Sequence, residues 1–393
     1  MVDEPEPAAR IPALAPANVQ VAPVRTRADR DEFVSLPWRI YAHDPAWVPP
    51  LRREVERFID PEHHPFYRHG AAAIFLARRN GEVAGRILVS DDPNYNREQG
   101  TNLGAFGLFE CVDDSEVARA LLHTAARWLR SRGRDSMLGP IEYSTNYTCG
   151  LLVDGFDTPP RLLMNHNPPY YEALLRGWGL APVKDLYAWW IDDPPDLRPW
   201  LARAARIEDN GVRIRRLRKR DLAREIERAS LVYHDAWAGN WGFVEMTDAE
   251  LADLGRHLAE IADERLLLIA ERDGEPVAFS MGLPDVNEAL RGVRDGRLVR
   301  GGLPIGLVRL LIGMRRIRTF RYFTLGVRPA FRGHGIAEAL MLSTVSTALG
   351  AGYRAAELGW TLEDNVRVNR IATRVGARPY KTYRIYEAAL EDG

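Results

Sequence analysis

The sequence is poor in cysteine, with Cys111 and Cys149 as its two cysteines in 393 residues. Two cysteines give no disulfide framework, and the absence of a C-x-x-C pair removes the usual metal and redox signature. We therefore expect no metal site and no permanently bound cofactor. A dominant charge is lacking too, since the formal net charge is −1. No global electrostatic field attracts nucleic acid, and we expect none as a partner.

Long hydrophobic runs are also missing. No apolar stretch approaches the ~20 residues of a membrane-spanning helix. The first residues, MVDEPEPAARIPALAPANV, are acidic and proline-rich where a signal peptide is basic and then apolar. Hydrophobic residues make up 46% of the chain and charged residues 27%, which is typical of a globular protein. The expected location is the cytoplasm.

The same order of elements is predicted twice along the chain: strand, helices, hairpin, strand, helix, strand, helix, strand. In the first half the hairpin turns at Asn80-Gly81, and in the second at Asp273-Gly274. The fold class is therefore α/β (α+β), in two tandem domains. We expect a disordered, Ala/Pro-rich tail at 1–17, a first domain at 18–192, a linker at 193–210 and a second domain at 211–393.

The most informative stretch is FRYFTLGVRPAFRGHGIAEALML, residues 320–342. Its aromatic and branched residues predict a strand ending near Val327, and the spacing of its later apolar residues predicts a helix. The glycine-rich turn between them brings backbone N–H groups together at the positive end of that helix. Such a turn is suited to binding a pyrophosphate.

The pattern R-x-x-G-x-A after V-x-P closely resembles the acyl-CoA-binding motif of the GNAT N-acyltransferase superfamily. The resemblance implies two GNAT-like domains, each a mixed, mostly antiparallel sheet flanked by helices. It implies acetyl-CoA or a longer acyl-CoA as co-substrate and an amine as acceptor. In that family the strand pairs with the pantetheine arm, and a backbone N–H there, of Gly326 or Val327 in this chain, polarises the thioester carbonyl. The implied CoA-binding residues are Leu325, Gly326, Val327, Arg332, Gly333, His334, Gly335, Ile336 and Ala337.

The first half lacks this cradle. In the place of the glycine-rich turn it has Asp113-Asp114-Ser115-Glu116, with Ser115 as the expected N-cap of a helix from Glu116 to Arg132. Three carboxylates at a helix start repel a pyrophosphate. The first half is therefore expected to be a degenerate copy that supports the structure or shapes the acceptor pocket.

Amide formation needs a base for the amine proton. The candidates are Glu363 and Asp364, after the strand predicted next to the central one, and Glu245, between two predicted helices. A helix cap or turn contact is the alternative role for Asp364, and a solvated loop position is the alternative for Glu245. His234 is a further candidate, with a structural role at a helix end as its alternative.

The segment from Asn365 to Gly376-Ala377 resembles the family's Asn…L-Y-E-K-x-G-F segment. The resemblance implies that Asn365 contacts pantetheine, but it places Ala372 where the family has a tyrosine that protonates the leaving thiolate. Either another group acts or the thiolate leaves unaided. The nearby tyrosines are Tyr380, Tyr383 and Tyr386, of which Tyr383 is the candidate acid.

Residues 291–321 carry nine arginines and one acid around the apolar segment 303–314. This pattern is typical of an interfacial helix on an anionic membrane, and a core-packed helix is the alternative. The interfacial interpretation predicts peripheral contact with the inner membrane through 291–321 and a lipid or sphingoid-base amine as acceptor. It also points to the superfamily branch of bacterial ceramide synthases.

Three other functions stay open. The first is a non-catalytic acyl-CoA sensor or scaffold, and the second is an acetyl-CoA-dependent N-acetyltransferase of a small soluble amine. The third is an aminoacyl-tRNA-dependent peptidyltransferase, which ranks last because it has no need of an intact pyrophosphate cradle. The sequence leaves the oligomeric state open.

Overall fold

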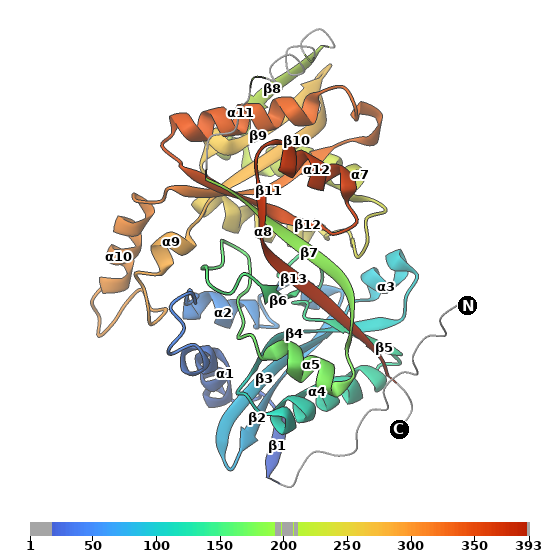
Figure 1. Ribbon diagram of the computed structural model, residues 1–393, viewed down its shortest axis with the longest axis vertical. Helices are drawn as coiled ribbons and strands as arrows, with labels where there is room; N and C mark the ends of the chain where they lie inside the picture. The colour runs from blue at the N-terminus through green and yellow to red at the C-terminus, as the bar shows by residue number, and fades with distance from the viewer. Residues whose placement is uncertain (1–17, 193–197, 199–206, 208–210, 391–393) are drawn as a thin grey trace.

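The structure is a computed structural model that describes residues 18–192, 198, 207 and 211–390 (Figure 1). The expected tail at 1–17 and most of the expected linker at 193–210 lie outside the described residues. None of the helices in the described ranges has both the length and the apolar character needed to traverse a bilayer.

The first half follows the predicted order and adds three short elements, α2, α3 and β6, whose sequences are too short to show a clear period. The cap of α4 differs from the prediction by one residue, since Asp114 and not Ser115 is its N-cap. The elements are β1 (Val19–Pro23), α1 (Arg27–Ile40), α2 (Arg52–Phe58), β2 (Ala71–Arg79), β3 (Glu82–Asp91), α3 (Pro93–Gln99), β4 (Leu103–Cys111), α4 (Ser115–Arg130), β5 (Ser136–Gly139), β6 (Leu151–Asp154), α5 (Tyr171–Trp178) and β7 (Ala181–Ile191).

The second half repeats the order and inserts a helical arm, α9 and α10, before the central strand. Its elements are β8 (Val212–Arg216), α7 (Leu222–Trp237), α8 (Asp248–Ile261), β9 (Leu267–Arg272), β10 (Glu275–Pro284), α9 (Asn287–Leu290), α10 (Ile305–Met314), β11 (Thr319–Val327), α11 (Ile336–Gly350), β12 (Ala355–Leu362), α12 (Val366–Arg374) and β13 (Arg378–Ala389).

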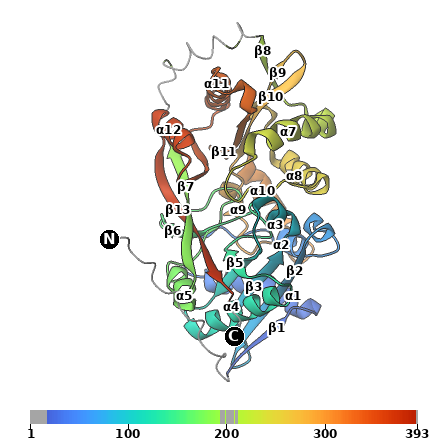
Figure 2. The same ribbon diagram turned by 90° about the vertical axis from the view of Figure 1, so that its right-hand side faces the viewer.

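The strands of the described chain join in one sheet of thirteen (Figures 1 and 2), in the order β1-β2-β3-β4-β5-β13-β7-β12-β11-β10-β9-β8, with β6 on β13. The pairs β4–β5 and β11–β12 are parallel and the other pairs are antiparallel. This confirms the predicted class of mixed, mostly antiparallel sheets flanked by helices.

The last strand of each half is exchanged between the halves. β7, from the first half, pairs with β12 of the second half, and β13, from the second, pairs with β5 and β6 of the first. β7 and β13 also pair with each other along most of their length. The sheet of each half is therefore completed by a strand of the other half.

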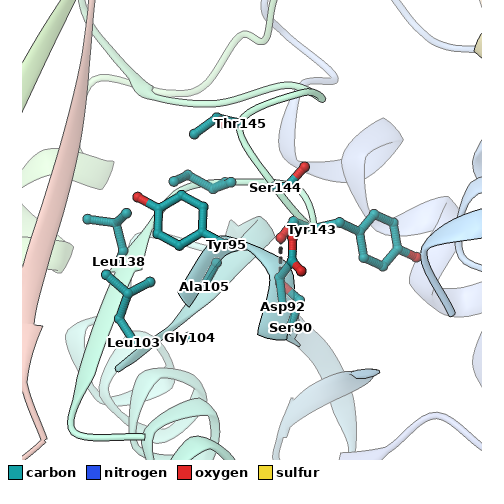
Figure 3. Close-up of a pocket in the computed structure, with 11 residues that line it drawn as sticks. Ser90, Asp92, Tyr95, Leu103, Gly104, Ala105, Leu138, Tyr143, Ser144 and Thr145 are labelled. Atoms are coloured by element: carbon teal, nitrogen blue, oxygen red, sulfur yellow. Dashed lines mark hydrogen bonds between the residues drawn. The ribbon is translucent and has the colours of Figure 1, made fainter. Parts of the chain in front are cut away.

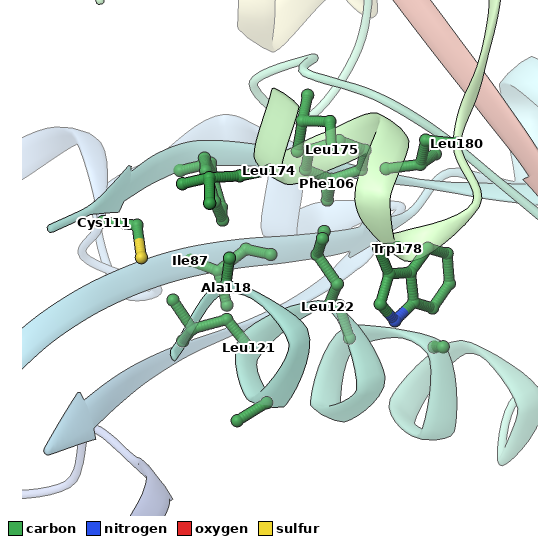
Figure 4. Packing of buried hydrophobic residues seen from close by; sticks show 14 of the residues in the cluster. Ile87, Phe106, Cys111, Ala118, Leu121, Leu122, Leu174, Leu175, Trp178 and Leu180 are labelled. Atoms are coloured by element: carbon green, nitrogen blue, oxygen red, sulfur yellow. The ribbon is translucent and has the colours of Figure 1, made fainter. Parts of the chain in front are cut away.

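The core of the first half shows why α4 is amphipathic. Its residues Val117, Leu121, Leu122 and Leu129 are fully buried and pack under the sheet against side chains of β3, β4 and α5 (Figure 4). Burying each such side chain stabilises the fold by about 2 kcal/mol. This packing fixes the start of α4 relative to the end of β4.

Candidate active site

The turn before α11 carries a row of backbone N–H groups without acceptors. Gly335 is the N-cap residue, with φ of 81°, and contributes no side chain to cap the helix. Gly333 has φ of 86°, and a Cβ there would meet no atom within 4 Å. Within the described residues, no hydrogen bond is assigned to the N–H groups of residues 333–337. These donors stand open to an anion at the positive end of a helix.

Two arginines hold this turn in place. Arg332 donates from Nε to Val327 O at 3.1 Å and from Nη2 to Ala236 O at 2.9 Å. Arg328 donates from Nε to Asp235 Oδ2 at 2.6 Å. The turn is thereby tied to the end of β11 and to the last turn of α7. Arg332 is exposed, so its positive charge also stands beside the open amides.

A divergence of two parallel strands lies next to the turn. β11 and β12 pair only as far as Tyr322 and Leu358, and Phe323 is an extra residue, a β-bulge, opposite β10 at that point. Beyond the bulge, residues 325–327 pair with β10 alone among the described strands. Their other edge faces the space between the diverging strands, as expected for the strand that pairs with pantetheine.

Gly326 is required by the close approach of α7. A Cβ at this position would lie 2.4 Å from the ring of Trp237, so any larger residue displaces that ring. Trp237 belongs to an aromatic group with Tyr233 and Phe279, at ring-centroid distances of 5.3 Å and 5.9 Å. The last turn of α7 therefore covers the end of the central strand.

The carboxylates predicted after β12 lie at its exposed end. Asp364 accepts from Lys184 Nζ at 2.8 Å, and this hydrogen bond lowers the pKa of the carboxyl group. Glu363 accepts from the backbone N–H of Asp185 at 3.2 Å. Asn365 caps α12 by accepting from Val368 N at 3.3 Å. Asp364 is thus paired with a lysine of β7, and Asn365 is the residue that caps the helix.

Ala372, at the family's tyrosine position, and the nearby candidate tyrosines have different surroundings. Ala372 is buried among apolar side chains. Tyr383 is fully buried, and its hydroxyl donates to Asn165 O at 3.3 Å; burial raises its pKa well above the ordinary value. Tyr380 is the extra residue of a bulge in β13, and its hydroxyl donates to Glu357. Tyr380 is therefore the one of these tyrosines that reaches β12 beside the divergence.

Glu357 forms a buried ion pair one residue before the strands diverge. It faces its register partner Arg321, with Arg321 Nε 3.1 Å from Glu357 Oε1 and both side chains no more than 3% exposed. Burial raises the pKa of Glu357, although Arg321 opposes the shift. Arg321 also donates to Leu162 O at 2.6 Å and Gly359 O at 2.8 Å. This network joins β11, β12, β13 and a loop of the first half.

Glu245 lies in the loop between α7 and α8, with its side chain 51% exposed, and is paired with Nδ1 of His234. Both residues are separate candidates in the sequence, and nothing in the sequence predicts that their side chains are in contact. They are eleven positions apart and are joined only by the course of the loop.

The first half fills its matching positions with its own groups. Asp114 Oδ1 accepts from the N–H groups of Glu116 at 2.9 Å and Val117 at 3.3 Å, so α4 is capped internally. At the last residue of β4, Cys111, the N–H donates to the Tyr171 hydroxyl and the C=O accepts from the Tyr170 hydroxyl, both at 2.8 Å. The sequence predicts the acidic start of α4, but it does not predict that Tyr170 and Tyr171 bind the end of β4.

The space beside β4 is also occupied. A Cβ at Gly107 would lie 2.4 Å from Ile141 O, and Ile141 N donates to Phe106 O at 2.6 Å. The chain after β5 therefore runs where the second half has its open divergence. These contacts are those of a degenerate copy.

A narrow pocket in the first half adjoins this filled region (Figure 3). Ser90 Oγ donates to Tyr143 O at 3.1 Å in its wall, and burial raises the pKa of Asp92. Thr145 at its rim donates to Gly242 O of the α7–α8 loop. The pocket is thus part of the contact between the halves. Its lining residues are Ser90, Asp92, Tyr95, Leu103, Gly104, Ala105, Leu138, Ile141, Tyr143, Ser144 and Thr145.

Known proteins resemble this chain in sequence and fold. The family described as "Acetyltransferase (GNAT) family" matches residues 228–377. Two solved structures share the fold along nearly the whole chain: a tandem GNAT protein from the clavulanic acid biosynthesis pathway (TM-score 0.55, 15% identity, covering 95% of this chain and 99% of that one), and a GCN5-related N-acetyltransferase from Sphaerobacter thermophilus (TM-score 0.55, 16% identity, 97% and 98%).

Two relatives are more similar in sequence. The bacterial ceramide synthase of Caulobacter vibrioides is 37% identical over 95% of this chain and 98% of its own length. Protein YghO of Escherichia coli K12 is 32% identical over 93% and 95%. The chain therefore belongs to the GNAT superfamily and is an N-acyltransferase. Within that superfamily it falls in the branch of the bacterial ceramide synthase.

Proposed function

We propose that this N-acyltransferase binds an acyl-CoA in the divergence of β11 and β12. The observation that carries the proposal is the uncapped start of α11 beside an unpaired strand edge. The pyrophosphate would accept from the N–H groups of residues 333–337, with the charge of Arg332 beside it, and the pantetheine arm would follow residues 325–327. His334 and Asn365 would flank this site. Residues 211–393 would form the acyl-CoA domain, and residues 18–192 would support it.

The proposed acceptor is the primary amine of a lipid or sphingoid base. The name of the 37% identical relative, bacterial ceramide synthase, supports a long-chain amine. The surface of α10 supports it independently. Among the described residues, seven of the thirteen exposed large hydrophobic side chains fall in 299–312, and these are Val299, Leu303, Ile305, Leu307, Val308, Leu311 and Ile312.

The packed side of α10 is formed by two glycines together with Leu310 and Met314, and its other apolar side chains face outward. A Cβ at Gly306 would lie 2.0 Å from Arg297 O, and one at Gly313 would lie 2.8 Å from Ala289. The arm projects from the body beside α9 (Figure 1) and is anchored to the first half, where Trp38 Nε1 donates to Arg294 O at 2.8 Å. An outward apolar face is not the pattern of a core-packed helix.

Exposed arginines surround this face. Of the nine arginines in 291–321, Arg321 is buried and the other eight are exposed. Each exposed cation near an anionic leaflet contributes about 1 kcal/mol to binding. We therefore place the enzyme on the cytoplasmic side, in peripheral contact with the inner membrane through 291–321.

Acyl transfer with paired donors and acceptors tests the substrate. The purified protein is incubated with acetyl-CoA or palmitoyl-CoA, and with sphinganine or a panel of water-soluble amines, and released CoA thiol is measured. We expect turnover with palmitoyl-CoA and sphinganine. Preference for acetyl-CoA and a soluble amine would establish the alternative, a small-molecule N-acetyltransferase.

Vesicle flotation tests the membrane contact. The double variant Val308→Glu/Leu311→Glu should lose roughly tenfold or more in binding to vesicles that contain phosphatidylglycerol. Leu231→Glu is a matched control, because Leu231 on α7 is 51% exposed and Val308 is 50% exposed. Equal flotation of the double variant and the control would rule out this surface.

A further inference from the structure

His234 and Glu245 form a histidine–carboxylate pair at the mouth of the proposed site. His234 is in the last turn of α7, with its side chain 33% exposed, and its Nδ1 contacts Glu245 Oε1. In the described part of the chain, no group is hydrogen-bonded to Nε2 of His234. A carboxylate on Nδ1 fixes the tautomer, so Nε2 is the ring atom that can accept a proton.

The residues that follow His234 contact the cradle and the central strand one after another. Asp235 pairs with Arg328 at 2.6 Å, the Ala236 carbonyl accepts from Arg332 at 2.9 Å, and the ring of Trp237 covers Gly326. The last turn of α7 is therefore placed over the end of β11, where the thioester carbonyl of the proposed acyl-CoA would be polarised. His234 belongs to the same turn, and its side chain is one-third exposed.

The first half holds the loop that carries Glu245. Glu98 Oε2 on α3 accepts from the N–H of Glu245 at 2.8 Å. Gln99 Nε2 donates to Phe243 O at 2.6 Å, and Asn146 Nδ2 donates to Val244 O at 2.8 Å. Three consecutive residues of the loop are thus fixed by side chains of the other half. The first half therefore positions the loop that carries the Glu245 carboxylate.

We propose that His234 is the general base of acyl transfer and that Glu245 is its positioning residue. The inference rests on the proposed function, since it needs a primary amine and a CoA thioester. Amines of this kind are largely protonated at neutral pH, with ordinary pKa values near those of lysine. Nε2 takes a proton from the ammonium group, and the neutral amine attacks the carbonyl carbon to form a C–N bond. The C–S bond then breaks, the imidazolium gives its proton to the CoA thiolate, and the second amine proton is released to solvent.

The charges around the pair suit a cationic amine. Glu98 adds a second carboxylate next to Glu245, and Arg97 lies 3.8 Å from Glu98. Asp235 is neutralised by Arg328. Tyr233 lies beside His234 at a ring distance of 5.8 Å. Lys184 lies over Trp241 of the same loop, 5.6 Å from its ring, and pairs with Asp364. Glu98, Asp235 and Asp364 thus each have a cationic partner. This leaves the His234–Glu245 pair beside aromatic rings, which favour an ammonium group on an apolar chain.

The pH dependence of kcat tests the proposal on the full-length protein. His234→Gln should lower kcat at neutral pH by roughly 100-fold to 1000-fold and remove the acidic limb of the profile. Its rate should recover at high pH, where the amine is neutral without a base. Glu245→Gln should lower kcat by roughly tenfold while the limb remains. Palmitoyl-CoA affinity, measured by calorimetry, should stay within about twofold of the wild type for both.

A second histidine–carboxylate pair provides the control. His257 Nδ1 lies 3.3 Å from Asp253 Oδ2 on α8, with its side chain 32% exposed, so His257→Gln removes a comparable pair elsewhere and should leave kcat unchanged. If His234→Gln keeps the acidic limb, the wild-type kcat and CoA binding, the assignment of His234 as the base is wrong. The proposed function would not be affected by that result. A wild-type enzyme that acylates only soluble amines would overturn the proposed acceptor, and the same variants would then test His234 with that amine.

Discussion

The units β4–α4 and β11–α11 occupy matching places in the two halves but satisfy their backbone polar groups in different ways. In the first, Asp114 caps the helix and the hydroxyls of Tyr170 and Tyr171 saturate the last residue of the strand. In the second, a glycine begins the helix without a side-chain cap, and the side-chain donor at the last residue of the strand is Arg332 of the turn itself, which reaches Val327 O. The same backbone geometry is closed by side chains in one copy and left open in the other.

The difference shows how the positions that form the proposed binding site in one half can serve as structural elements in the other. A carboxylate at the helix start and two hydroxyls at the strand end supply hydrogen bonds of the kind that a phosphate and a pantetheine amide supply. No change of topology is needed. The open copy keeps its donors available, and the closed copy uses them in hydrogen bonds that stabilise its own fold.

Separating the two halves of the chain should have the largest effect. Residues 211–393 expressed alone lack β7, so β12 and β13 lose the strand between them. We expect this fragment to show no cooperative unfolding and no CoA binding. As a control, a protease site between residues 193 and 210 allows the folded chain to be cut, and the exchanged strands should keep the cut halves together in gel filtration. A fragment 211–393 that folds and binds CoA would show that the copies are independent.

Closing the open copy should abolish its ligand binding. Gly335→Asp places a carboxylate at the start of α11, at the position that Asp114 occupies at α4, and its negative charge repels a pyrophosphate. We expect CoA affinity to fall on the order of 100-fold in calorimetry. Gly274→Asp is the matched control, since Gly274 has φ of 83° and no atom within 4 Å of a Cβ. Equal affinities in the two variants would contradict a cradle at α11.

Removing the hydroxyl of Tyr171 should destabilise the closed copy. This group accepts from Cys111 N and donates to Glu110 Oε2 at 2.7 Å. Tyr171→Phe therefore leaves a buried N–H donor unpaired and removes one hydrogen bond from a buried carboxylate, which keeps the hydrogen bond from Tyr41. We expect a loss of about 2 kcal/mol in urea unfolding, with kcat unchanged. If kcat fell and stability did not, the tyrosine would belong to the chemistry.

Removing the cap of the closed copy should have the smallest effect. Asp114→Ala should cost about 1 kcal/mol of stability and should create no second CoA site, because Tyr170, Tyr171 and the chain at Ile141 still fill the space. Calorimetry of this variant should give one CoA per chain. A stoichiometry of two would mean that the cap alone keeps the first copy from binding.

The sequence predicted the parts of this structure that depend on neighbouring residues. The strand before Val327, the turn and the helix after it follow from local propensity and spacing, as does the acidic start of α4. The exchange of β7 and β13 could not be predicted in this way, because the two strands are equivalent in their halves and strand pairing is set by contacts far apart in sequence.

The catalytic candidates illustrate the same limit. Tyr380, Tyr383 and Tyr386 are alternatives in the sequence, and only the bulge in β13 aims Tyr380 at Glu357. Glu245 and His234 were separate candidates until the loop after α7 brought them together. The isolated Arg321 within an arginine-rich run is buried against Glu357, and composition alone groups it with its exposed neighbours.

The position of β13 also has a consequence for biosynthesis. β5 pairs with β4 along one edge, but its other edge and β6 both pair with β13, residues 378–389. While the ribosome is still translating the second half, the nascent first half therefore carries an unfinished sheet edge. The sheet of the first half is complete only after residues 378–389 have been translated, so a chain that stops before them would leave both halves incomplete at once.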